Sequence, residues 1–287
     1  MRKKKIMVAM VTPFDEHLDL DEKAVIRLCH HLISMRVDGI VVCGTTGEVS
    51  SLSFDERAQL LNLVKKTVGN KAEIWMGCGT NNTSTTLQYC LQAEQIGVDG
   101  IMLITPYYVR PSQKGLLEHF SMIASTIKTP LMLYNVPKRT GINLEAKTVI
   151  ELGRRFEHIV MLKQAHDDPQ ATLQIMAESN IRVLCGDDFN YVEALQLGVD
   201  GIVSVAAQVD CRLLHRLHEG FSLGILSQHV IQKWKQLSRM CFRVSSPSDV
   251  KCMLSLIGIC HDEVRLPLVK LDSEEKQRLQ RFLEDEL

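Results

Sequence analysis

The sequence lacks long apolar runs and a clear excess of charge of either sign. No apolar stretch approaches the ~20 residues that a helix needs to span a bilayer. The 33 basic and 34 acidic side chains give a net charge of −1, whereas a protein that owes its affinity to phosphate backbones would be basic. The basic start and the apolar residues 6–11 would suit a signal peptide, but Thr12-Pro13 and acidic residues interrupt the pattern. We therefore expect a soluble, cytoplasmic protein whose partners are neither nucleic acids nor membranes.

The sequence also lacks the cysteine and histidine spacings of a metal site. Its nine cysteines form no C-x-x-C pair, and its ten histidines are scattered. Cys43, Cys78 and Cys185 each close an apolar run, which is typical of buried thiols in a reducing compartment. We expect neither a metal nor a cofactor.

One phrase, Val-Asp-Gly-Ile, occurs three times, at residues 37–40, 98–101 and 199–202. Each copy follows a helix-like stretch and leads into a short apolar run. Glycine allows a left-handed helix cap or a close backbone approach, so the phrase predicts the end of a helix followed by a buried strand. The spacing of the copies suits multiples of one β-α unit.

The first 205 residues alternate between short apolar runs and amphipathic segments. The predicted strands are Ile6–Val11, Gly39–Cys43, Glu73–Cys78, Gly100–Ile104, Leu131–Tyr134, Ile159–Lys163, Arg182–Cys185 and Gly201–Val205. The predicted helices between them are Asp21–Met35, Ser53–Val68, Thr83–Ile96, Ser112–Ile127, Asn143–Arg155, Pro169–Glu178 and Asp188–Leu197. Nearly continuous apolar strands indicate burial on both faces of a parallel sheet. An open doubly wound sheet is the alternative, but no G-x-G-x-x-G follows the first strand.

Eight such units predict an α/β fold, an eight-stranded parallel β/α (TIM) barrel. Beyond residue 205, helices follow one another without strands, at Arg212–Glu219, Leu226–Met240, Asp249–Ile259 and Ser273–Leu283. We therefore expect residues 1–206 to form the barrel, with the active site at the C-terminal strand ends, and residues 207–287 to form an appended helical layer.

Lys163 closes the sixth predicted strand, on the same face as Ile159 and Met161. If that face is the barrel interior, burial disfavours the charged ammonium form, and a neutral amine becomes available to attack a carbonyl and form a Schiff base. A lysine that extends to solvent where its strand ends is the alternative.

Hydroxyl groups follow two other strands. Tyr134 ends the neighbouring strand, and Thr45 and Thr46 lie in a glycine-flanked turn after the second. Such hydroxyls can relay protons, and backbone N–H groups of the turn could hold a carboxylate. Each has an ordinary alternative, as a core aromatic or as a simple turn.

Two loops carry further candidates. Arg139 follows a rigid Val-Pro and could clamp a substrate carboxylate with two hydrogen bonds, unless it is a solvated surface residue. Tyr107 and Tyr108 are adjacent in a chain with only 5% aromatic residues, on a loop stiffened by two prolines. This pattern favours an interface or a site.

Several motifs occur together in one order: Met10-Val-Thr-Pro-Phe14, Gly44-Thr-Thr-Gly-Glu48, Thr105-Pro-Tyr-Tyr108, Pro111-Ser-Gln113, Gly115-Leu-Leu-Glu-His-Phe120, Tyr134-Asn-Val-Pro-Lys-Arg-Thr-Gly141, Lys163 and Gly186-Asp-Asp188. In these motifs, over about residues 6–270, the sequence resembles the dihydrodipicolinate synthase family of pyruvate-dependent class I aldolases. The resemblance implies a lyase that condenses pyruvate with L-aspartate 4-semialdehyde to give 4-hydroxy-tetrahydrodipicolinate, in the diaminopimelate route to lysine.

The resemblance also implies a role for each matched residue. Lys163 would form the Schiff base and Tyr134 would carry protons, with Thr45 completing a relay to Tyr108 from the adjoining subunit of a homotetramer, a dimer of dimers. The implied substrate-binding residues are Thr46 and the backbone at Val203 for the pyruvate carboxylate, Arg139 for the carboxylate of the semialdehyde, and Gly186.

The sequence departs from the family pattern in places. Gln164 stands where the family usually has glutamate, and residues 245–251 keep only part of an Asn-Pro-x-Pro-Val-Lys segment. Phe54 and Thr85 replace the histidine and glutamate of lysine-inhibited members, so we predict weak or no feedback by lysine.

Two alternatives to the synthase remain. One is another pyruvate aldolase of the superfamily, such as an N-acetylneuraminate lyase or a ketodeoxy-sugar-acid aldolase, which Arg139 disfavours. The other is a non-catalytic binding barrel, which the complete set of Lys163, Tyr134, Thr45 and Tyr108 disfavours.

Overall fold

The computed structural model describes residues 3–286, and its eight parallel strands form a closed barrel in the order of the sequence. This confirms the predicted fold class. By its internal contacts the chain divides into two units, one made of the residues up to Lys5 with Glu73–Val203, and one made of Ile6–Ala72 with the residues from Ser204 onwards. The division at residues 206/207 stays a prediction. None of the helices within residues 3–286 combines the length and the apolar character that a membrane span requires.

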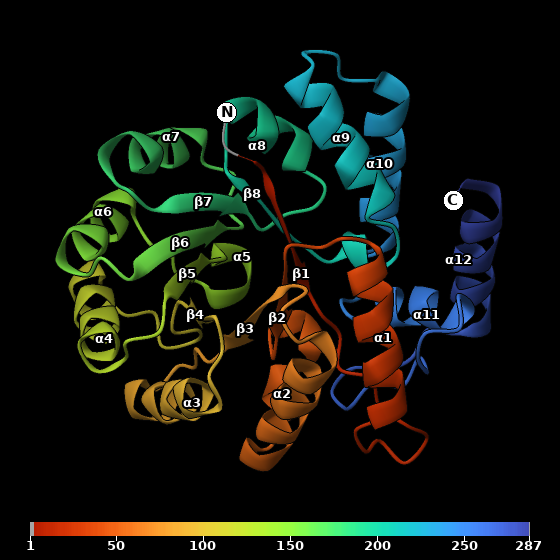
Figure 1. The fold of residues 1–287 in the computed structure, drawn as a ribbon, viewed down its shortest axis with the longest axis horizontal. Helices are drawn as coiled ribbons and strands as arrows, with labels where there is room; N and C mark the ends of the chain where they lie inside the picture. Colours follow the sequence, from red (N-terminus) through yellow and green to blue (C-terminus); the bar gives the residue numbers. More distant parts are fainter. Residues whose placement is uncertain (1–2, 287) are drawn as a thin grey trace. The chain divides into compact units, whose positions relative to one another are not determined.

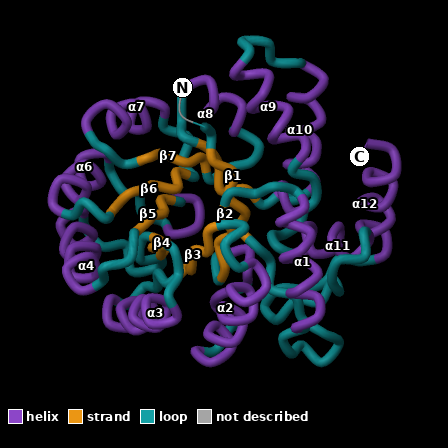
Figure 2. Tube along the Cα trace, viewed as in Figure 1, coloured by secondary structure: helices purple, strands orange, loops and turns teal. Residues whose placement is uncertain are grey.

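The first unit contains six strands and the helices that connect them. Its elements are β3 (Glu73–Gly77), α3 (Thr83–Ile96), β4 (Gly100–Ile104), α4 (Gln113–Thr126), β5 (Leu131–Asn135), α5 (Pro137–Thr140), α6 (Ala146–Arg155), β6 (Ile159–Gln164), α7 (Pro169–Glu178), β7 (Arg182–Cys185), α8 (Tyr191–Leu197) and β8 (Gly201–Ser204). Each strand pairs in parallel with the next. Figure 1 shows α3, α4, α6 and α7 outside these strands, which Figure 2 draws in orange.

The second unit contains the first two strands and the helices after the last strand. Its elements are β1 (Lys5–Ala9), α1 (Glu22–Ser34), β2 (Gly39–Val42), the 3₁₀ helices η1 (Thr45–Gly47) and η2 (Val49–Ser51), α2 (Phe54–Val68), η3 (Ala206–Gln208), α9 (Arg212–Ser222), α10 (Gln228–Met240), α11 (Ser248–Leu256) and α12 (Ser273–Glu286). Helices α1 and α2 pack against each other, as do α9 and α10 (Figure 1). The α-helices after β8 are those that the sequence predicts, whereas η3 is not predicted.

Glycines in and directly before the second and third repeated phrases act as expected. Gly97 and Gly198 end α3 and α8 in the left-handed conformation, with φ of 82° and 99°. At Gly201, an added Cβ would lie 2.0 Å from the carbonyl oxygen of Lys5, so no side chain fits between these two strands. Before the second and third copies, glycine therefore sets the helix stop locally, whereas α1, before the first copy, ends at Met35 without a glycine.

The aspartates of the same phrases do something that the sequence alone does not reveal. Asp38, Asp99 and Asp200 each use a side-chain oxygen to accept the backbone N–H of a residue at the start of the preceding strand, at 2.8, 2.7 and 3.1 Å. Each also donates its own backbone N–H to the carbonyl of that same residue. The phrase thus ties the start of one strand to its neighbour at the N-terminal end of the sheet, opposite to the strand ends where chemistry is expected.

Helix α5 is the one α-helix of the described residues that the sequence pattern does not predict. Four residues are too few for a helical period to be visible. Pro137 occupies the first turn, where its missing N–H costs nothing, and Gly141 ends the helix with φ of 74°. The helix begins two residues after β5 and therefore sets the position of Arg139.

Candidate active site

Lys163 and Tyr134 lie side by side at the C-terminal ends of β6 and β5. They are paired in the register of the two strands, and the amine nitrogen of Lys163 lies 4.3 Å from the centre of the Tyr134 ring. Both residues are about 5% exposed. No acidic side chain of the described residues in this unit forms an ion pair with the amine. The amine therefore lies in the interior against an aromatic ring, and no carboxylate of this unit blocks it.

The register of these two strands is held from their opposite face. The next residues along, Asn135 and Gln164, are also paired, and the Asn135 side-chain N–H₂ donates to the Gln164 Oε1 at 2.9 Å. The Asn135 side-chain oxygen accepts the backbone N–H of Leu144 at 2.9 Å. Alternate side chains point to opposite faces of a strand. The hydrogen bond between Asn135 and Gln164 on the outer face therefore keeps Tyr134 and Lys163 on the inner face. Gln164, which departs from the family pattern, serves here as an acceptor.

Gly186 leaves room for the lysine side chain. A Cβ at this position would lie 2.9 Å from both Cγ and Cε of Lys163 and 2.9 Å from the Cβ of Ala165. These distances are shorter than ordinary van der Waals contact. The absence of a side chain at residue 186 therefore lets the lysine extend along the end of β7 toward Tyr134.

Cys185, just before Gly186, is a second nucleophile type near the same amine. Burial raises the pKa of its thiol to about 12, which outweighs the opposing effects of the Asp187 backbone hydrogen bond and of Lys163. Because the thiolate is the reactive form, this cysteine is inert at neutral pH. No group of three or more His, Cys, Asp or Glu within residues 3–286 is placed to hold a metal ion. The amine of Lys163 is therefore the group best suited to nucleophilic attack.

The loops after β4 and β5 are joined to each other. The backbone N–H of Tyr108 donates to the carbonyl of Thr140 at 3.3 Å, and the hydroxyl of Thr105 donates to that of Thr140 at 3.2 Å. Tyr108 has φ of 72° and is 88% exposed, and Arg139 is also exposed. The two predicted loop residues thus stand on one braced pair of loops in the first unit, with their side chains open to solvent.

Val203 lies at the end of β8, buried, one residue beyond the positions of β8 that pair with β7. In the second unit, Thr45 and Thr46 form η1 with Gly47, directly after β2, and Thr46 is buried. The hydroxyl of Thr12 donates to the carbonyl of Gly47 at 2.6 Å and holds this turn from the side of β1.

The sequence reasoning missed Glu48 and its partners. Glu48 completes the Gly44–Glu48 motif, and Lys251 ends the segment 245–251, so both carried a signal as parts of matched motifs. In the structure the two side chains form a buried ion pair at 2.5 Å. Such a contact between distant segments cannot be deduced from either motif alone.

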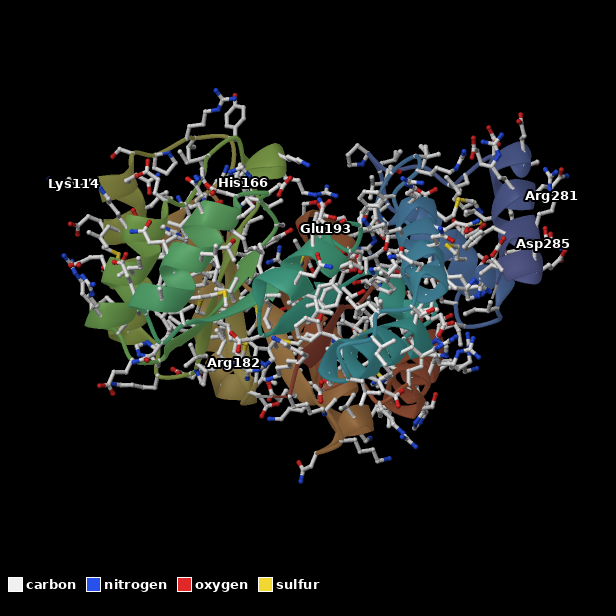
Figure 3. The ribbon with its side chains drawn as sticks, turned by 90° about the horizontal axis from the view of Figure 1, so that it is seen from above. Lys114, His166, Arg182, Glu193, Arg281 and Asp285 are labelled. Atoms are coloured by element: carbon white, nitrogen blue, oxygen red, sulfur yellow. The ribbon has the colours of Figure 1, made fainter. Side chains whose placement is uncertain are left out.

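A cavity of about 400 Å³ lies elsewhere in the first unit, lined by residues of β7, α7 and α8. His166 and Glu193, both labelled in Figure 3, are among its lining residues, whereas Lys163 and Tyr134 are not. The cavity is therefore separate from the lysine and tyrosine pair.

Comparison with known proteins shows the family and supports the fold. The model of the dihydrodipicolinate synthetase family matches residues 2–286. The chain is 37% identical over 285 residues to the 4-hydroxy-tetrahydrodipicolinate synthase of Oceanobacillus iheyensis, covering 98% of this chain and 96% of the relative. It is 38% identical over 287 residues to that of Moorella thermoacetica, covering 98% and 97%. The crystal structure of dihydrodipicolinate synthase DapA-2 from Bacillus anthracis has a TM-score of 0.93 and 35% identity, and the match covers 99% of each chain.

Proposed function

The chain belongs to the dihydrodipicolinate synthetase family, and we propose that Lys163 is the amine through which it acts. It is a Schiff-base-forming lyase that condenses pyruvate with L-aspartate 4-semialdehyde to give 4-hydroxy-tetrahydrodipicolinate, in diaminopimelate and lysine biosynthesis. The observation that carries the proposal for Lys163 is its place beside Tyr134, buried, at the C-terminal end of a barrel strand.

The chemistry starts with the neutral amine. Its nitrogen attacks the keto carbon of pyruvate, a C–N bond forms, and the carbonyl oxygen takes up a proton. Loss of that oxygen as water leaves an iminium, which withdraws electrons so that a methyl proton can leave and an enamine forms. The enamine carbon then attacks the aldehyde carbon and a C–C bond forms. The aldehyde oxygen takes up a proton and becomes a hydroxyl group, and the iminium is restored. The amino group of the second substrate attacks the iminium carbon, closes the ring and releases the lysine.

Each of these steps moves a proton near the lysine nitrogen, and Tyr134 is the proposed carrier. Its ring lies against the amine, so its phenol can donate to the leaving oxygen and later take the proton back. The roles of Thr45 as the next member of the relay and of Thr46 and the Val203 backbone as the holders of the pyruvate carboxylate rest on the family resemblance.

Arg139 is proposed as the residue that receives the carboxylate of the semialdehyde. It is exposed on α5, two residues beyond Pro137, and a guanidinium can bind a carboxylate with two parallel hydrogen bonds. Gly186 contributes by leaving space for Lys163. We therefore propose that specificity for the semialdehyde over sugar acids depends on the β5–α5 segment.

Tyr108 supports the proposal of a homotetramer built as a dimer of dimers. A tyrosine that is 88% exposed on a loop braced by Thr140 has its ring free to reach an adjoining subunit, where it would complete the relay. We further place the enzyme in the cytoplasm, in keeping with nine cysteines that are all buried and with the biosynthetic role of the family.

Borohydride reduction tests the role of Lys163. With pyruvate present, reduction should leave a stable three-carbon adduct on Lys163, located by peptide mass spectrometry. The Lys163→Arg variant should give none, while Lys5→Arg, which alters a lysine at the opposite end of the strands, should still give the adduct. An adduct on another lysine, or none in the unmodified protein, would remove the proposal.

A further inference from the structure

We propose that Glu48 is a positioning residue, whose carboxylate is held by Lys251 and Arg265 so that the Thr45-Thr46 turn keeps the conformation that catalysis uses. The proposal rests on the function proposed above, since it concerns the two threonines. It assigns a role in the reaction to the helical segment after β8, which contributes Lys251 and Arg265 and lies outside the strand ends.

The backbone of Glu48 is in an unfavourable conformation. With φ of 53° and ψ of 38°, it lies in the left-handed region and separates η1 from η2. Its N–H donates to the carbonyl of Thr45 at 3.1 Å, and its carbonyl accepts the N–H of Ser51 at 2.9 Å. A residue with a Cβ avoids this region, so something other than local preference must hold it there.

The side chain of Glu48 provides that hold. It is 3% exposed, and each carboxylate oxygen has a partner: Oε1 accepts from the Lys251 amine at 2.5 Å, and Oε2 accepts from the backbone N–H of Arg265 at 2.9 Å. Moving Glu48 out of the left-handed region would swing the carboxylate away from both donors. The two contacts therefore restrain the backbone of the turn.

Lys251 is fully buried, and its amine has two hydrogen-bond acceptors and one aromatic neighbour. Its amine also donates to the carbonyl of Glu263 at 2.6 Å and lies 4.2 Å from the centre of the Phe14 ring. Burial lowers the pKa of Lys251, and the Glu48 carboxylate opposes that shift. An ion pair placed in the interior is a poor way to gain stability, because apolar side chains of equal size often do as well. The ion pair is therefore better explained by its effect on the conformation of the Glu48 backbone than by its effect on stability.

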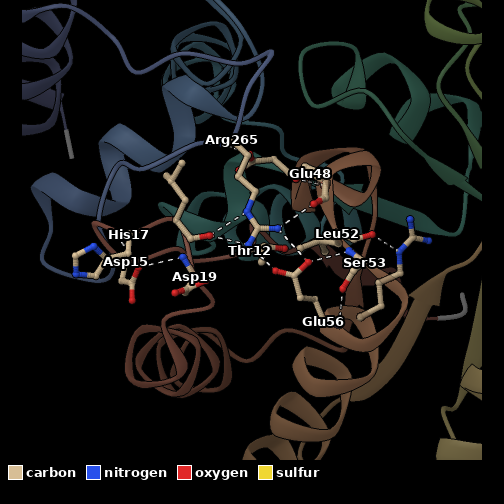
Figure 4. A network of polar contacts seen from close by, with 12 residues as sticks. Thr12, Asp15, His17, Asp19, Glu48, Leu52, Ser53, Glu56 and Arg265 are labelled. Carbon is tan, nitrogen blue, oxygen red and sulfur yellow. Dashed lines mark hydrogen bonds and ion pairs between the residues drawn. The ribbon is translucent and has the colours of Figure 1, made fainter.

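Arg265 extends the restraint along the segment that follows the turn. Its guanidinium donates to both carboxylate oxygens of Glu56, at 2.5 and 3.1 Å, and to the carbonyl of Ser51 at 2.9 Å, and it lies 4.3 Å from the centre of the Phe14 ring. Figure 4 shows Arg265 extending between Glu48 and Glu56. The segment from Glu48 to the start of α2 is thus fastened at three points to one arginine.

The test separates backbone conformation from side-chain contact. Glu48 is replaced either by glycine or by alanine, in each case together with Lys251→Met. Removing both members of the ion pair leaves neither charge buried without its partner. Both variants lose the carboxylate, but glycine enters the left-handed region freely while alanine does not. We expect kcat/KM for pyruvate to be roughly 5- to 30-fold higher for Glu48→Gly than for Glu48→Ala, with equal KM for the semialdehyde. A purely structural role also makes the glycine variant the more stable of the two in thermal unfolding, but it leaves kcat/KM of the two folded variants equal.

Glu73→Gln is the matched control. Glu73 pairs with Lys5 at 2.5 and 2.6 Å, near the N-terminal ends of the strands, so its loss should lower the thermal midpoint without changing kcat/KM for pyruvate. Equal kcat/KM for the glycine and alanine variants, or unmodified kinetics in the alanine variant, would overturn the positioning role. Borohydride trapping on Lys163 of the unmodified protein is scored separately, and its failure would overturn the proposed function instead.

Discussion

Replacing Gly186 by alanine tests the geometry around Lys163 directly. The added Cβ would lie 2.9 Å from two carbons of the lysine side chain, whereas ordinary contact begins near 3.4 Å. Something must move by about 0.5 Å or more. The backbone N–H of Gly186 donates to the carbonyl of Gln164 at 2.7 Å, which limits how far the backbone can move. The contact with the Ala165 Cβ forces a small backbone shift, the flexible lysine side chain yields further, and its amine moves relative to Tyr134.

The size of the effect follows from that shift. A misplacement of a reacting group by about 1 Å costs about 10²-fold in rate, so we expect kcat for Gly186→Ala to fall by roughly 10- to 100-fold. One extra methyl group in a packed site also costs about 1–3 kcal/mol of folding stability. The rate and the stability must therefore be measured together.

The assay compares Gly186→Ala with Gly153→Ala. At Gly153 in α6, an added Cβ would meet the tip of Ile181 at 2.8 Å, which is a similar clash at a position that touches neither Lys163 nor Tyr134. Both variants should lose similar stability by thermal unfolding, but only Gly186→Ala should lose kcat and the rate of borohydride trapping with pyruvate. Normal trapping and turnover in a folded Gly186→Ala protein would refute the argument.

Four further changes have defined outcomes. Tyr134→Phe should lower kcat by roughly 10²-fold or more, because the proton carrier is lost, and near-normal steady-state turnover would exclude that role. Arg139→Ala should raise KM for the semialdehyde roughly 10- to 100-fold with little change for pyruvate, and equal losses for the two substrates would reassign the residue. Burial lowers the pKa of His119 to about 4, so the stability that its neutral form contributes is present above pH 6.5 and is lost as the pH falls to 4. In the His119→Gln variant the thermal midpoint should therefore change less with pH between 6.5 and 4. An unchanged pH dependence of the midpoint would contradict this. Thr85 offers no carboxylate for an ammonium ligand, so L-lysine should not inhibit at low-millimolar concentrations, and a titration that shows inhibition would contradict the prediction.

The fold and the central pair of the site were predictable because both depend on local signals. Apolar strands that begin after glycine-marked helix ends predict a parallel barrel, and consecutive strands of such a barrel are neighbours. Lys163 and Tyr134 close consecutive strands, so their contact follows from chain order and from the alternation of side chains. The structure adds the distance between the Lys163 amine and the Tyr134 ring, and the hydrogen bond between Asn135 and Gln164 on the other face of the strands.

The remaining features depend on contacts between segments that are distant in sequence. Glu48 and Lys251 are 203 positions apart, and no periodicity relates them. The strand-tying role of Asp99 requires knowing which strand lies beside it, and α5 is too short to leave a helical pattern. Such features become visible only when tertiary packing brings the partners together.

The most direct test of the central claim is a crystal structure of the protein grown with pyruvate. The account predicts continuous electron density from the amine nitrogen of Lys163 to the second carbon of the keto acid, with the Tyr134 hydroxyl within hydrogen-bond distance of the new bond. Pyruvate bound without a covalent link, or linked to a different residue, would contradict it.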